Sequence, residues 1–400
     1  MARSVEVLVV GGGPAGAAAA AALAGRGREV LVLERSLFPR EKLCGDFIHP
    51  YGVVALEPLG VLTELRPHAR ILTGMRIVSP AGREVFAPFP GGVGLSLSRA
   101  VLDDCLLRAA RRAGAAVETG RAVRGAHRRG GRWRIRTDDG EIAARILVGA
   151  DGARSLVARA AGLSRSPTRR GRYAVGLRVR GLAMWEGYAE MHLARGAYCG
   201  VSAFPGGEAN VTMVGAKRAI SRSRDLIART LLDRAARELL APFPALRNRV
   251  EAGTITQLRA IGPLAPSHRP VVADGVVLVG DAAAHTDPLT GQGVSMALTG
   301  AAVAAEVIDR ALTAGNAGAP ALADYARWHR RRCGGLRRFL RLIDWVALRS
   351  PLIEPLARAW GSHPVVASRF LGIIGNADPV RGALTPAYLS RLALACIWRA

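Results

Sequence analysis

The sequence predicts an α/β fold with a parallel sheet, an inserted antiparallel β-sheet and C-terminal helices. Three apolar runs of the kind that form buried parallel strands are each followed by a glycine-bearing turn and a helix-forming segment. Four strand-like segments at hairpin spacing lie between the second and third of these units. From residue 320 onward the pattern is helical and rich in arginine.

The first unit predicts a Rossmann-like dinucleotide-binding motif. An apolar strand at residues 5–10 leads into Gly11-x-Gly13-x-x-Gly16, an alanine-rich helix and a second strand that ends at Glu34. Gly11 permits a tight turn, Gly13 lets the backbone approach a pyrophosphate, and Gly16 allows close helix–strand packing. The helix N-terminus offers N–H groups to phosphates. A carboxylate at Glu34 suits a free adenosine ribose, so NADP is not expected in this motif.

The charge balance narrows the choice of partners. The formal net charge is +25, yet only two of the 56 basic residues are lysines, which is typical of a high-GC codon bias. Basic residues are spread along the chain and no nucleic-acid-binding signature is present, so nucleic acid is not an expected partner. An acidic membrane surface or an acidic carrier protein suits this charge better.

Cysteine use and apolar runs indicate a cytoplasmic protein. The five cysteines show neither CxxC nor metal-ligand spacing, so we expect reduced thiols and no metal site. No charge-free apolar run reaches the ~20 residues of a membrane span. The N-terminus lacks a basic region before a hydrophobic segment and a cleavage site, so a signal peptide is not expected.

A loop at residues 38–50, FPREKLCGDFIHP, follows the second strand. Cys44-Gly45 within it is either a redox thiol or a small residue and a turn that pack beside a cofactor. The neighbouring basic residues favour a thiolate, but the packing role is the simpler interpretation. Asp46 and His49 either line a substrate cavity or lie on the surface.

Residues 98–114 predict a helix, with Gly114 as its stop. Arg99 lies in its first turn, where a cation does not help the helix dipole, so it either reaches an anionic group such as a pyrophosphate or is an ordinary surface arginine. A strand and a small antiparallel meander follow, with expected strands at 116–119, 122–127, 133–137 and 141–147.

The second unit is ILVGADGARS. An apolar strand at 146–148 precedes Asp151-Gly152, and a helix is expected from Ser155. An acid at a strand end beside glycines can meet a cofactor, and an Asp-Gly turn with a helix cap is the alternative. The antiparallel strands after it are expected at 173–179, 188–193, 198–204 and 209–214, followed by a helix at 225–240 and a strand at 253–258.

The third unit runs from residue 275 to residue 308. A buried strand at 276–279 ends at Gly280-Asp281, and a loop with Pro288, Gly291 and Gly293 leads into a long helix of small residues. The helix N-terminus suits the partial negative charge of a reduced flavin. His285 is a candidate acid or base, although a structural hydrogen-bonded histidine is the commoner case.

Together the three units resemble the FAD-dependent hydroxylase superfamily, which includes aromatic hydroxylases, flavin halogenases and geranylgeranyl reductases. The matching motifs are GGGPAG with Glu34, GADGARS, and GDAAAHTDPLTGQGVSMAL. The resemblance implies FAD binding, with Arg99 near the phosphates and Asp281 at the ribityl chain. The implied FAD-binding positions are Gly11, Gly13, Pro14, Ala15, Gly16, Glu34, Arg35, Cys44, Gly45, Arg99, Asp151, Gly152, Gly280, Asp281, Pro288, Gly291, Gln292 and Gly293.

The loop FPREKLCGDF is similar to the geranylgeranyl reductase-like branch, where a proline, a spacer and Cys-Gly follow the second strand. Phe204-Pro205 is also retained. Gly200 and Ser202 stand where that branch carries aromatic residues, which argues against saturation of an isoprenoid chain. The tryptophan-rich signature of flavin halogenases is absent, so halogenation is not expected.

The expected organisation has three parts. Residues 1–75, 96–165 and 265–320 form a discontinuous FAD-binding domain, residues 76–95 and 166–264 form a substrate domain, and residues 321–400 form a helical cap. The amphipathic basic stretch in the cap either packs on the body with a solvated face, lies on an anionic membrane, or covers the substrate cavity.

The sequence therefore predicts an FAD-dependent oxidoreductase, most simply a monooxygenase that hydroxylates a hydrophobic aromatic, polyketide or isoprenoid compound with NAD(P)H and O₂. One alternative is a geranylgeranyl reductase-like reduction of a carbon–carbon double bond. Another is a non-catalytic flavin-binding scaffold on a membrane or a partner. Cys44 and His285 are weak catalytic candidates. The substrate, the nicotinamide preference and the oligomeric state stay open.

Overall fold

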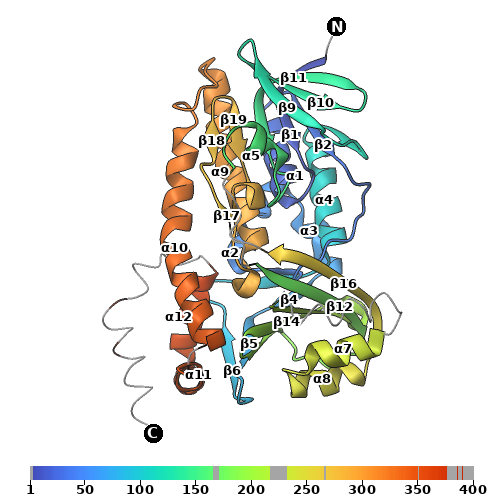
Figure 1. Cartoon of the computed structure of the whole chain (residues 1–400), viewed down its shortest axis with the longest axis vertical. Helices are drawn as coiled ribbons and strands as arrows, with labels where there is room; N and C mark the ends of the chain where they lie inside the picture. The colour runs from blue at the N-terminus through green and yellow to red at the C-terminus, as the bar shows by residue number, and fades with distance from the viewer. Residues whose placement is uncertain are drawn as a thin grey trace.

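The computed structural model describes residues 3–164, 171–216, 232–264, 267–349 and 351–375, with the single positions 385 and 390. Figure 1 shows a parallel sheet with its helices in the upper part of the molecule and an antiparallel sheet below it. The long helix α10 (Ala323–Arg349) runs along one side of both.

The parallel sheet has the strand order β18-β19-β11-β1-β2-β8, with β1 at its centre. Strands β1, β2, β8, β11 and β19 are mutually parallel, while β18 is antiparallel to β19. The bounds are β1 (Arg3–Val10), β2 (Val30–Glu34), β8 (Ala116–Thr119), β11 (Gly140–Gly149), β18 (Val272–Ala273) and β19 (Val276–Leu278).

Strand β11 differs from its prediction because it is continuous. The sequence suggested one meander strand at 141–147 and a separate sheet strand at 146–148. In the structure the first half of β11 pairs antiparallel with β10 (Arg132–Thr137), while the whole strand pairs in parallel with β1. The meander strand expected at 122–127 is β9 (Gly125–Arg129), which pairs only with β10.

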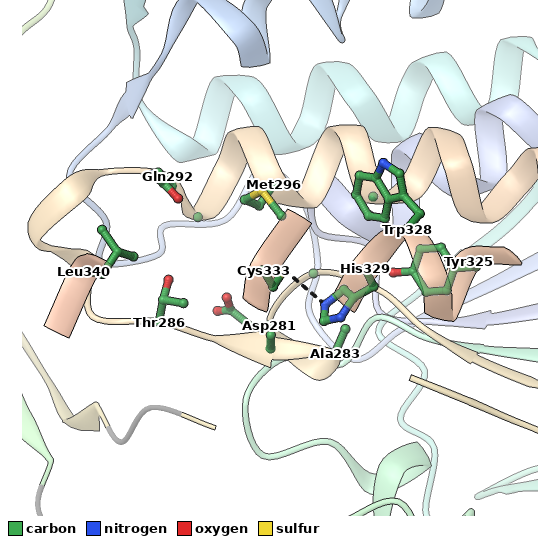
Figure 2. Close-up of a pocket in the computed structure, with 14 residues that line it drawn as sticks. Asp281, Ala283, Thr286, Gln292, Met296, Tyr325, Trp328, His329, Cys333 and Leu340 are labelled. Atoms are coloured by element: carbon green, nitrogen blue, oxygen red, sulfur yellow. Dashed lines mark hydrogen bonds between the residues drawn. The ribbon is translucent and has the colours of Figure 1, made fainter. Parts of the chain in front are cut away.

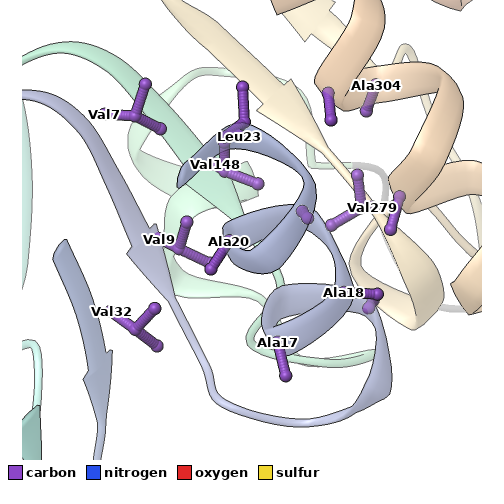
Figure 3. Close-up of a cluster of buried hydrophobic side chains, with 14 of the residues drawn as sticks. Val7, Val9, Ala17, Ala18, Ala20, Leu23, Val32, Val148, Val279 and Ala304 are labelled. Carbon is purple, nitrogen blue, oxygen red and sulfur yellow. The ribbon is translucent and has the colours of Figure 1, made fainter. Parts of the chain in front are cut away.

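Helix α1 (Pro14–Ala24) is buried almost all round because its alanines allow close approach on two sides. It packs against β1 and β2 of the sheet, against α4 (Arg99–Arg112) and against α9 (Gly293–Thr313). Figure 3 shows this core, in which Ala17, Ala20 and Leu23 of α1 lie among side chains of the strands and of α9. The short helix α5 (Leu156–Ala160) follows β11.

The antiparallel sheet has the strand order β16-β12-β15-β14-β13-β5-β6. One pair departs from the expected pattern, because β5 lies parallel to β13. The bounds are β5 (Gly74–Val78), β6 (Glu84–Pro88), β12 (Arg172–Arg180), β13 (Tyr188–Ala194), β14 (Ala197–Ala203), β15 (Glu208–Gly215) and β16 (Thr254–Leu264).

Two hydrophobic clusters cover this sheet. One forms with α7 (Leu232–Leu240) and α8 (Pro244–Glu251), and the other with α10, α11 (Ile353–Ser362) and α12 (Pro364–Ile374). The first part of the helix predicted at 225–240 lies outside the described residues, as does most of the chain after residue 375. No helix within the described ranges combines the length and the apolar character needed to span a bilayer.

The remaining short elements connect these layers. They are β3 (Phe47–Ile48), α2 (Pro50–Val54), η1 (Glu57–Leu59), α3 (Leu62–Leu65), η2 (Arg66–His68), β4 (Arg70–Leu72), β7 (Gly94–Ser96), η3 (Pro205–Gly207), β17 (Ser267–His268), η4 (Gly280–Ala282), β20 (Ala284–His285) and η5 (Pro288–Thr290).

Candidate functional site

The carboxyl ends of β1, β2, β11 and β19 meet at one edge of the parallel sheet, which brings the three glycine motifs together. The turn after β1 touches the turn after β11, because a methyl group at Gly11 would lie 2.5 Å from the carbonyl oxygen of Ala150. Gly11 also has a φ of +105°, which favours glycine. A methyl group at Gly16 would lie 1.9 Å from the carbonyl oxygen of Gly11. These glycines are therefore required by the close packing of three backbone segments.

The third motif reaches the first through Gly280. A methyl group at Gly280 would lie 2.7 Å from the Cβ atom of Ala15, in the first turn of α1. Pro14 and Ala15 are buried there, and no side chain caps the N-terminus of α1 at Gly13. The N–H groups of that first turn are consequently left for another acceptor, as a phosphate-binding helix requires.

Glu34 is buried at the end of β2 and is already hydrogen-bonded by the protein. Its Oε2 atom accepts a hydrogen bond from the backbone N–H of Gly12 at 2.7 Å, and its Oε1 atom accepts one from Ser36 at 2.9 Å. These contacts fix the carboxylate beside the glycine turn. Arg35, the next residue, is exposed.

Arg99 is buried and pairs with Asp103 one helical turn later. Its guanidinium donates two hydrogen bonds to that carboxylate, at 2.7 and 2.8 Å. Burial opposes the charge, but Asp103 and the nearby Cys44 raise the pKa of Arg99 above its usual value. The arginine is thus neither a surface residue nor free to turn away from Asp103.

Two basic residues of the 38–50 loop join this cluster. Arg40 lies 3.2 Å from Asp103 through its Nη2 atom, and the same atom is 3.4 Å from where a Cβ at Gly13 would be. Lys42 is close enough to Arg99 and Asp281 to feel both charges, and burial followed by Arg99 lowers its pKa. Arg40 therefore stands at the glycine turn, which the sequence gave no reason to expect.

Cys44 anchors the loop to the antiparallel sheet. The carbonyl oxygen of Cys44 accepts hydrogen bonds from Asn210 at 2.7 Å and from Thr212 at 3.2 Å, both on β15. The Cys44 thiol interacts with Arg99. Gly45 is exposed. This loop thus bridges the two sheets.

Asp46 and His49 are both fully buried, so the surface alternative for them is wrong. Asp46 accepts a hydrogen bond from the backbone N–H of Arg99 and pairs with Arg178 at 2.9 Å. Burial raises the pKa of Asp46 to about 7, against the opposing effect of these two arginines. His49 contacts the carbonyl oxygen of Thr290 at 2.8 Å, and burial lowers its pKa to about 4.

Asp151 caps the helix that follows it. Its Oδ2 atom accepts hydrogen bonds from the N–H groups of Leu156 at 2.6 Å and Val157 at 3.2 Å. Its Oδ1 atom is buried and has no hydrogen-bond partner within the described ranges. Gly152 has a φ of +83°, as a tight turn requires. The helix-cap alternative is therefore confirmed, and Oδ1 is left for another donor.

Asp281 and His285 form an ion pair at 3.5 Å. Burial alone would lower the pKa of His285, but Asp281 and then Asp287 raise it above its usual value. Burial would raise the pKa of Asp281, but His285, Lys42 and Arg99 hold it below its usual value. Each group therefore favours the charged form of the other.

The loop from Asp287 to Gly293 is held from both sides. Asp287 accepts hydrogen bonds from the Tyr198 hydroxyl at 2.6 Å and from Arg172 at 2.9 Å, while His49 contacts the carbonyl oxygen of Thr290. Arg172 also pairs with Asp344 of α10. The loop is therefore tied to β12, β14 and α10.

The end of this loop, at the N-terminus of α9, has the features of a ligand-binding site. Gly291 has a φ of +66°, and nothing lies within 4 Å of where a Cβ at Gly293 would be. No side chain among the described residues caps the N-terminus of α9. Thr290 Oγ1, Gln292 Nε2 and Ser295 Oγ are buried without a hydrogen-bond partner in the described part of the chain. Three unsatisfied polar atoms around one helix N-terminus indicate that a polar ligand completes it.

A pocket open to solvent adjoins this point, and the space inside it together with the solvent at its mouth amounts to about 560 Å³. Figure 2 shows Asp281, Thr286 and Gln292 beside it, with side chains of α10 forming its other wall. Its apolar lining includes Met296, Trp328 and Leu340. A smaller space of about 250 Å³ lies between the 41–46 segment and the antiparallel sheet, where Arg178 and Asn210 line it.

Comparison with known proteins places this arrangement in a family. A family model described as "FAD binding domain" matches residues 4–334. The chain belongs to this family. It is an FAD-dependent oxidoreductase of the FAD-dependent hydroxylase superfamily, in the geranylgeranyl reductase-like branch.

Two relatives and one solved structure illustrate this placement. The chain is 35% identical over 329 residues to a menaquinone reductase of Mycobacterium tuberculosis, covering 76% of this chain and 77% of the relative. It is 30% identical over 386 residues to digeranylgeranylglycerophospholipid reductase 1 of Methanothermobacter thermautotrophicus, covering 90% and 91%. A geranylgeranyl bacteriochlorophyll reductase-like structure from Thermoplasma acidophilum has the same fold, with a TM-score of 0.70, 24% identity and coverage of 98% and 96%.

The uncapped N-termini of α1 and α9, the close-packed glycines and the unsatisfied atoms near Gln292 fit FAD. The individual FAD contacts remain predictions. Sequence reasoning missed Asp103, Asp287 and Tyr198 as parts of the site. The four-residue spacing of Arg99 and Asp103 on a helix could have indicated their pairing, whereas nothing local connects Tyr198 with Asp287.

Proposed function

We propose that this oxidoreductase adds two hydrogens to a carbon–carbon double bond of an isoprenoid lipid or an isoprenoid quinone, with NAD(P)H as the electron source. The observation that carries the proposal is the similarity over most of the chain to relatives named menaquinone reductase and digeranylgeranylglycerophospholipid reductase. The apolar wall of the cavity beside Gln292 supports a hydrophobic substrate.

The proposed FAD site uses the predicted positions. Gly11, Gly13 and Gly16 would receive the pyrophosphate at α1, and Glu34 would accept a hydrogen bond from the ribose. To this set we add Arg40, because its guanidinium stands beside Gly13.

At the other end of the proposed site, Asp281 would hold the ribityl chain. Gln292 and Gly293 would meet the flavin ring at the N-terminus of α9. The proposed contacts also include Pro14, Ala15, Arg35, Cys44, Gly45, Arg99, Asp151, Gly152, Gly280, Pro288 and Gly291.

When bound, FAD supplies two-electron chemistry, taking a hydride from NAD(P)H and passing one to the substrate. One carbon of the double bond gains that hydride and the other gains a proton, so each turnover consumes one NAD(P)H and one proton. The protein must therefore hold a proton near the acceptor. His285 suits this role better than Cys44, because Asp281 and Asp287 raise the pKa of His285.

The polar residues around the loop would set its position. Tyr198, Arg172 and His49 contact Asp287 and Thr290, so the start of α9 would receive the flavin without rearrangement of this loop. Burial and Asp287 keep the pKa of Tyr198 well above its usual value, so this phenol stays a donor. We regard Tyr198 as a positioning residue.

The test is anaerobic turnover of the FAD-loaded protein with NADH or NADPH and either menaquinone or a digeranylgeranyl phospholipid. A product that has gained two hydrogens, detected by mass spectrometry, is the expected result. If the product instead gains oxygen under air and no reaction occurs anaerobically, the result would support the hydroxylation that the sequence predicted. The names of the relatives favour reduction over that hydroxylation.

A further inference from the structure

The outer face of α10 combines exposed arginines with exposed apolar side chains. We call this surface the α10 outer face. Its members are Arg327, Arg330, Arg331, Arg341, Leu342 and Trp345, all exposed to solvent. Most are spaced by three, four or seven residues, which places them on one side of the helix.

The opposite face of α10 already has a role, because it forms a wall of the cavity described above. Tyr325, Trp328, His329, Cys333 and Leu340 line that cavity. Asp344 also points inward, where it pairs with Arg172. The α10 outer face therefore contributes to neither the cavity nor the core.

Large apolar side chains are exposed at the C-terminal end of this face. Leu342 is 53% exposed and Trp345 is 47% exposed. Leu352, just after α10, and Val365, at the start of α12, are 51% and 75% exposed. Four of the ten large apolar side chains exposed in the described residues thus fall between residues 342 and 365 of the chain, and two of them belong to the α10 outer face.

The arginines on this face have few acidic neighbours. Arg327 pairs with Asp324. For Arg330, Arg331 and Arg341, no ion pair occurs within the described ranges. Glu354 is occupied elsewhere, since it accepts hydrogen bonds from Ser79 and Ala81. The face is consequently cationic and can attract an anionic surface.

We propose that the α10 outer face docks on the surface of an anionic lipid bilayer. Arginines on one face with tryptophan and leucine beside them are typical of helices that lie in a membrane interface. Figure 1 shows α10 along one side of the molecule, and the side chains of its outer face are exposed to solvent. A lipid surface takes up exposed apolar side chains beside cationic ones without shape complementarity, which docking on an acidic carrier protein would require.

Docking in this orientation would place the cavity-lining face of α10 directly behind the membrane contact. The bilayer in which a hydrophobic substrate dissolves would then be separated from the cavity by the width of one helix, about 10–12 Å. This consequence rests on the proposed function, but the docking itself does not, because it requires no turnover.

The test is co-sedimentation of the full-length, FAD-loaded protein with vesicles of phosphatidylcholine alone or mixed with phosphatidylglycerol. We expect binding to the anionic vesicles that weakens as salt rises, and little binding to the neutral ones. Removing three charges in Arg330→Gln/Arg331→Gln/Arg341→Gln should weaken it roughly a hundredfold, at about fivefold for each arginine near the surface. Leu342→Ser/Trp345→Ser should weaken it on the order of tenfold.

Matched controls separate the α10 outer face from overall charge and hydrophobicity. Arg66→Gln/Arg111→Gln/Arg129→Gln removes the same charge from exposed sites elsewhere, and Trp185→Ser removes a tryptophan that is 49% exposed. Both should bind vesicles as the wild type does. Equal losses in test and control variants, or equal binding to neutral and anionic vesicles, would overturn the proposal. So would capture of an acidic carrier protein, lost in the α10 variants, without vesicle binding.

Discussion

The hydroxyl of Tyr198 offers a direct measure of how firmly the loop at Asp287 is held. Tyr198 is 2% exposed, and its hydroxyl donates to Asp287 at 2.6 Å. Tyr198→Phe removes this donor and leaves the carboxylate with Arg172 and the N–H of Leu289. Because hydrogen bonds to charged groups contribute about 1.5–3 kcal/mol, the free energy of unfolding should fall by about 2 kcal/mol.

Tyr325→Phe deletes the same atom from an equally buried side chain and serves as the matched control. The Tyr325 hydroxyl donates to the carbonyl oxygen of Leu278 at 2.9 Å, so its acceptor is neutral. Its loss should cost about 1 kcal/mol. Urea unfolding of the FAD-loaded proteins, followed by circular dichroism, measures both values.

The comparison would refute this reasoning if the two variants lost equal stability, or if Tyr325→Phe lost more. Either result would mean that the charge of Asp287 does not strengthen its hydrogen bond with Tyr198, or that Arg172 alone is enough to stabilise the carboxylate. A double variant, Tyr198→Phe with Asp287→Asn, distinguishes these cases, since the two losses should not add when both residues act through one hydrogen bond.

Three further predictions follow from the same site. Gly16→Ala would place a methyl group 1.9 Å from the carbonyl oxygen of Gly11, so the purified protein should lose its flavin absorbance; retained flavin would contradict the close packing. Burial lowers the pKa of His49 from 6.5 to about 4, so the unfolded chain takes up a proton at this histidine before the folded protein does. The free energy of unfolding should therefore fall by about 3 kcal/mol as the pH falls from 6.5 towards 4. In pH-dependent unfolding, His49→Gln should remove most of this decrease. His285→Asn should slow substrate reduction by about a hundredfold or more and abolish the alkaline decline of its rate, while Cys44→Ser should retain the wild-type pH profile; the reverse pattern would move the proton to Cys44.

The parallel sheet could be read from the sequence because its signals are local. An apolar strand, a glycine turn and a helix occupy adjacent positions, and the parallel pairing of the strands then brings Gly11, Ala150 and Gly280 to one edge. The superfamily and the FAD-dependent chemistry followed from these motifs and are confirmed. No local motif of this kind distinguished hydroxylation from reduction, although hydroxylation was the favoured prediction.

The interior of the site was less predictable because its contacts join distant segments. Asp287 meets Tyr198 and Arg172 across about a hundred positions, and periodicity cannot reveal such a pair. Strand β11 was divided in two because its partner on one side changes along its length, from β10 to β19, while β1 pairs with it on the other side. The burial of His49 depends on Phe47, Phe89 and Thr290, which only the assembled fold brings together.

The late position of β19 has a consequence for how the chain is made. This strand and Gly280 complete an edge that begins at Val10, so the nucleotide cradle spans about two thirds of the sequence. A ribosome that has released only the first 250 residues exposes β1, α1 and β11 without the last strand. Such long-range pairing is slow to form. The growing chain must therefore keep an unfinished apolar sheet from aggregating until its final third emerges.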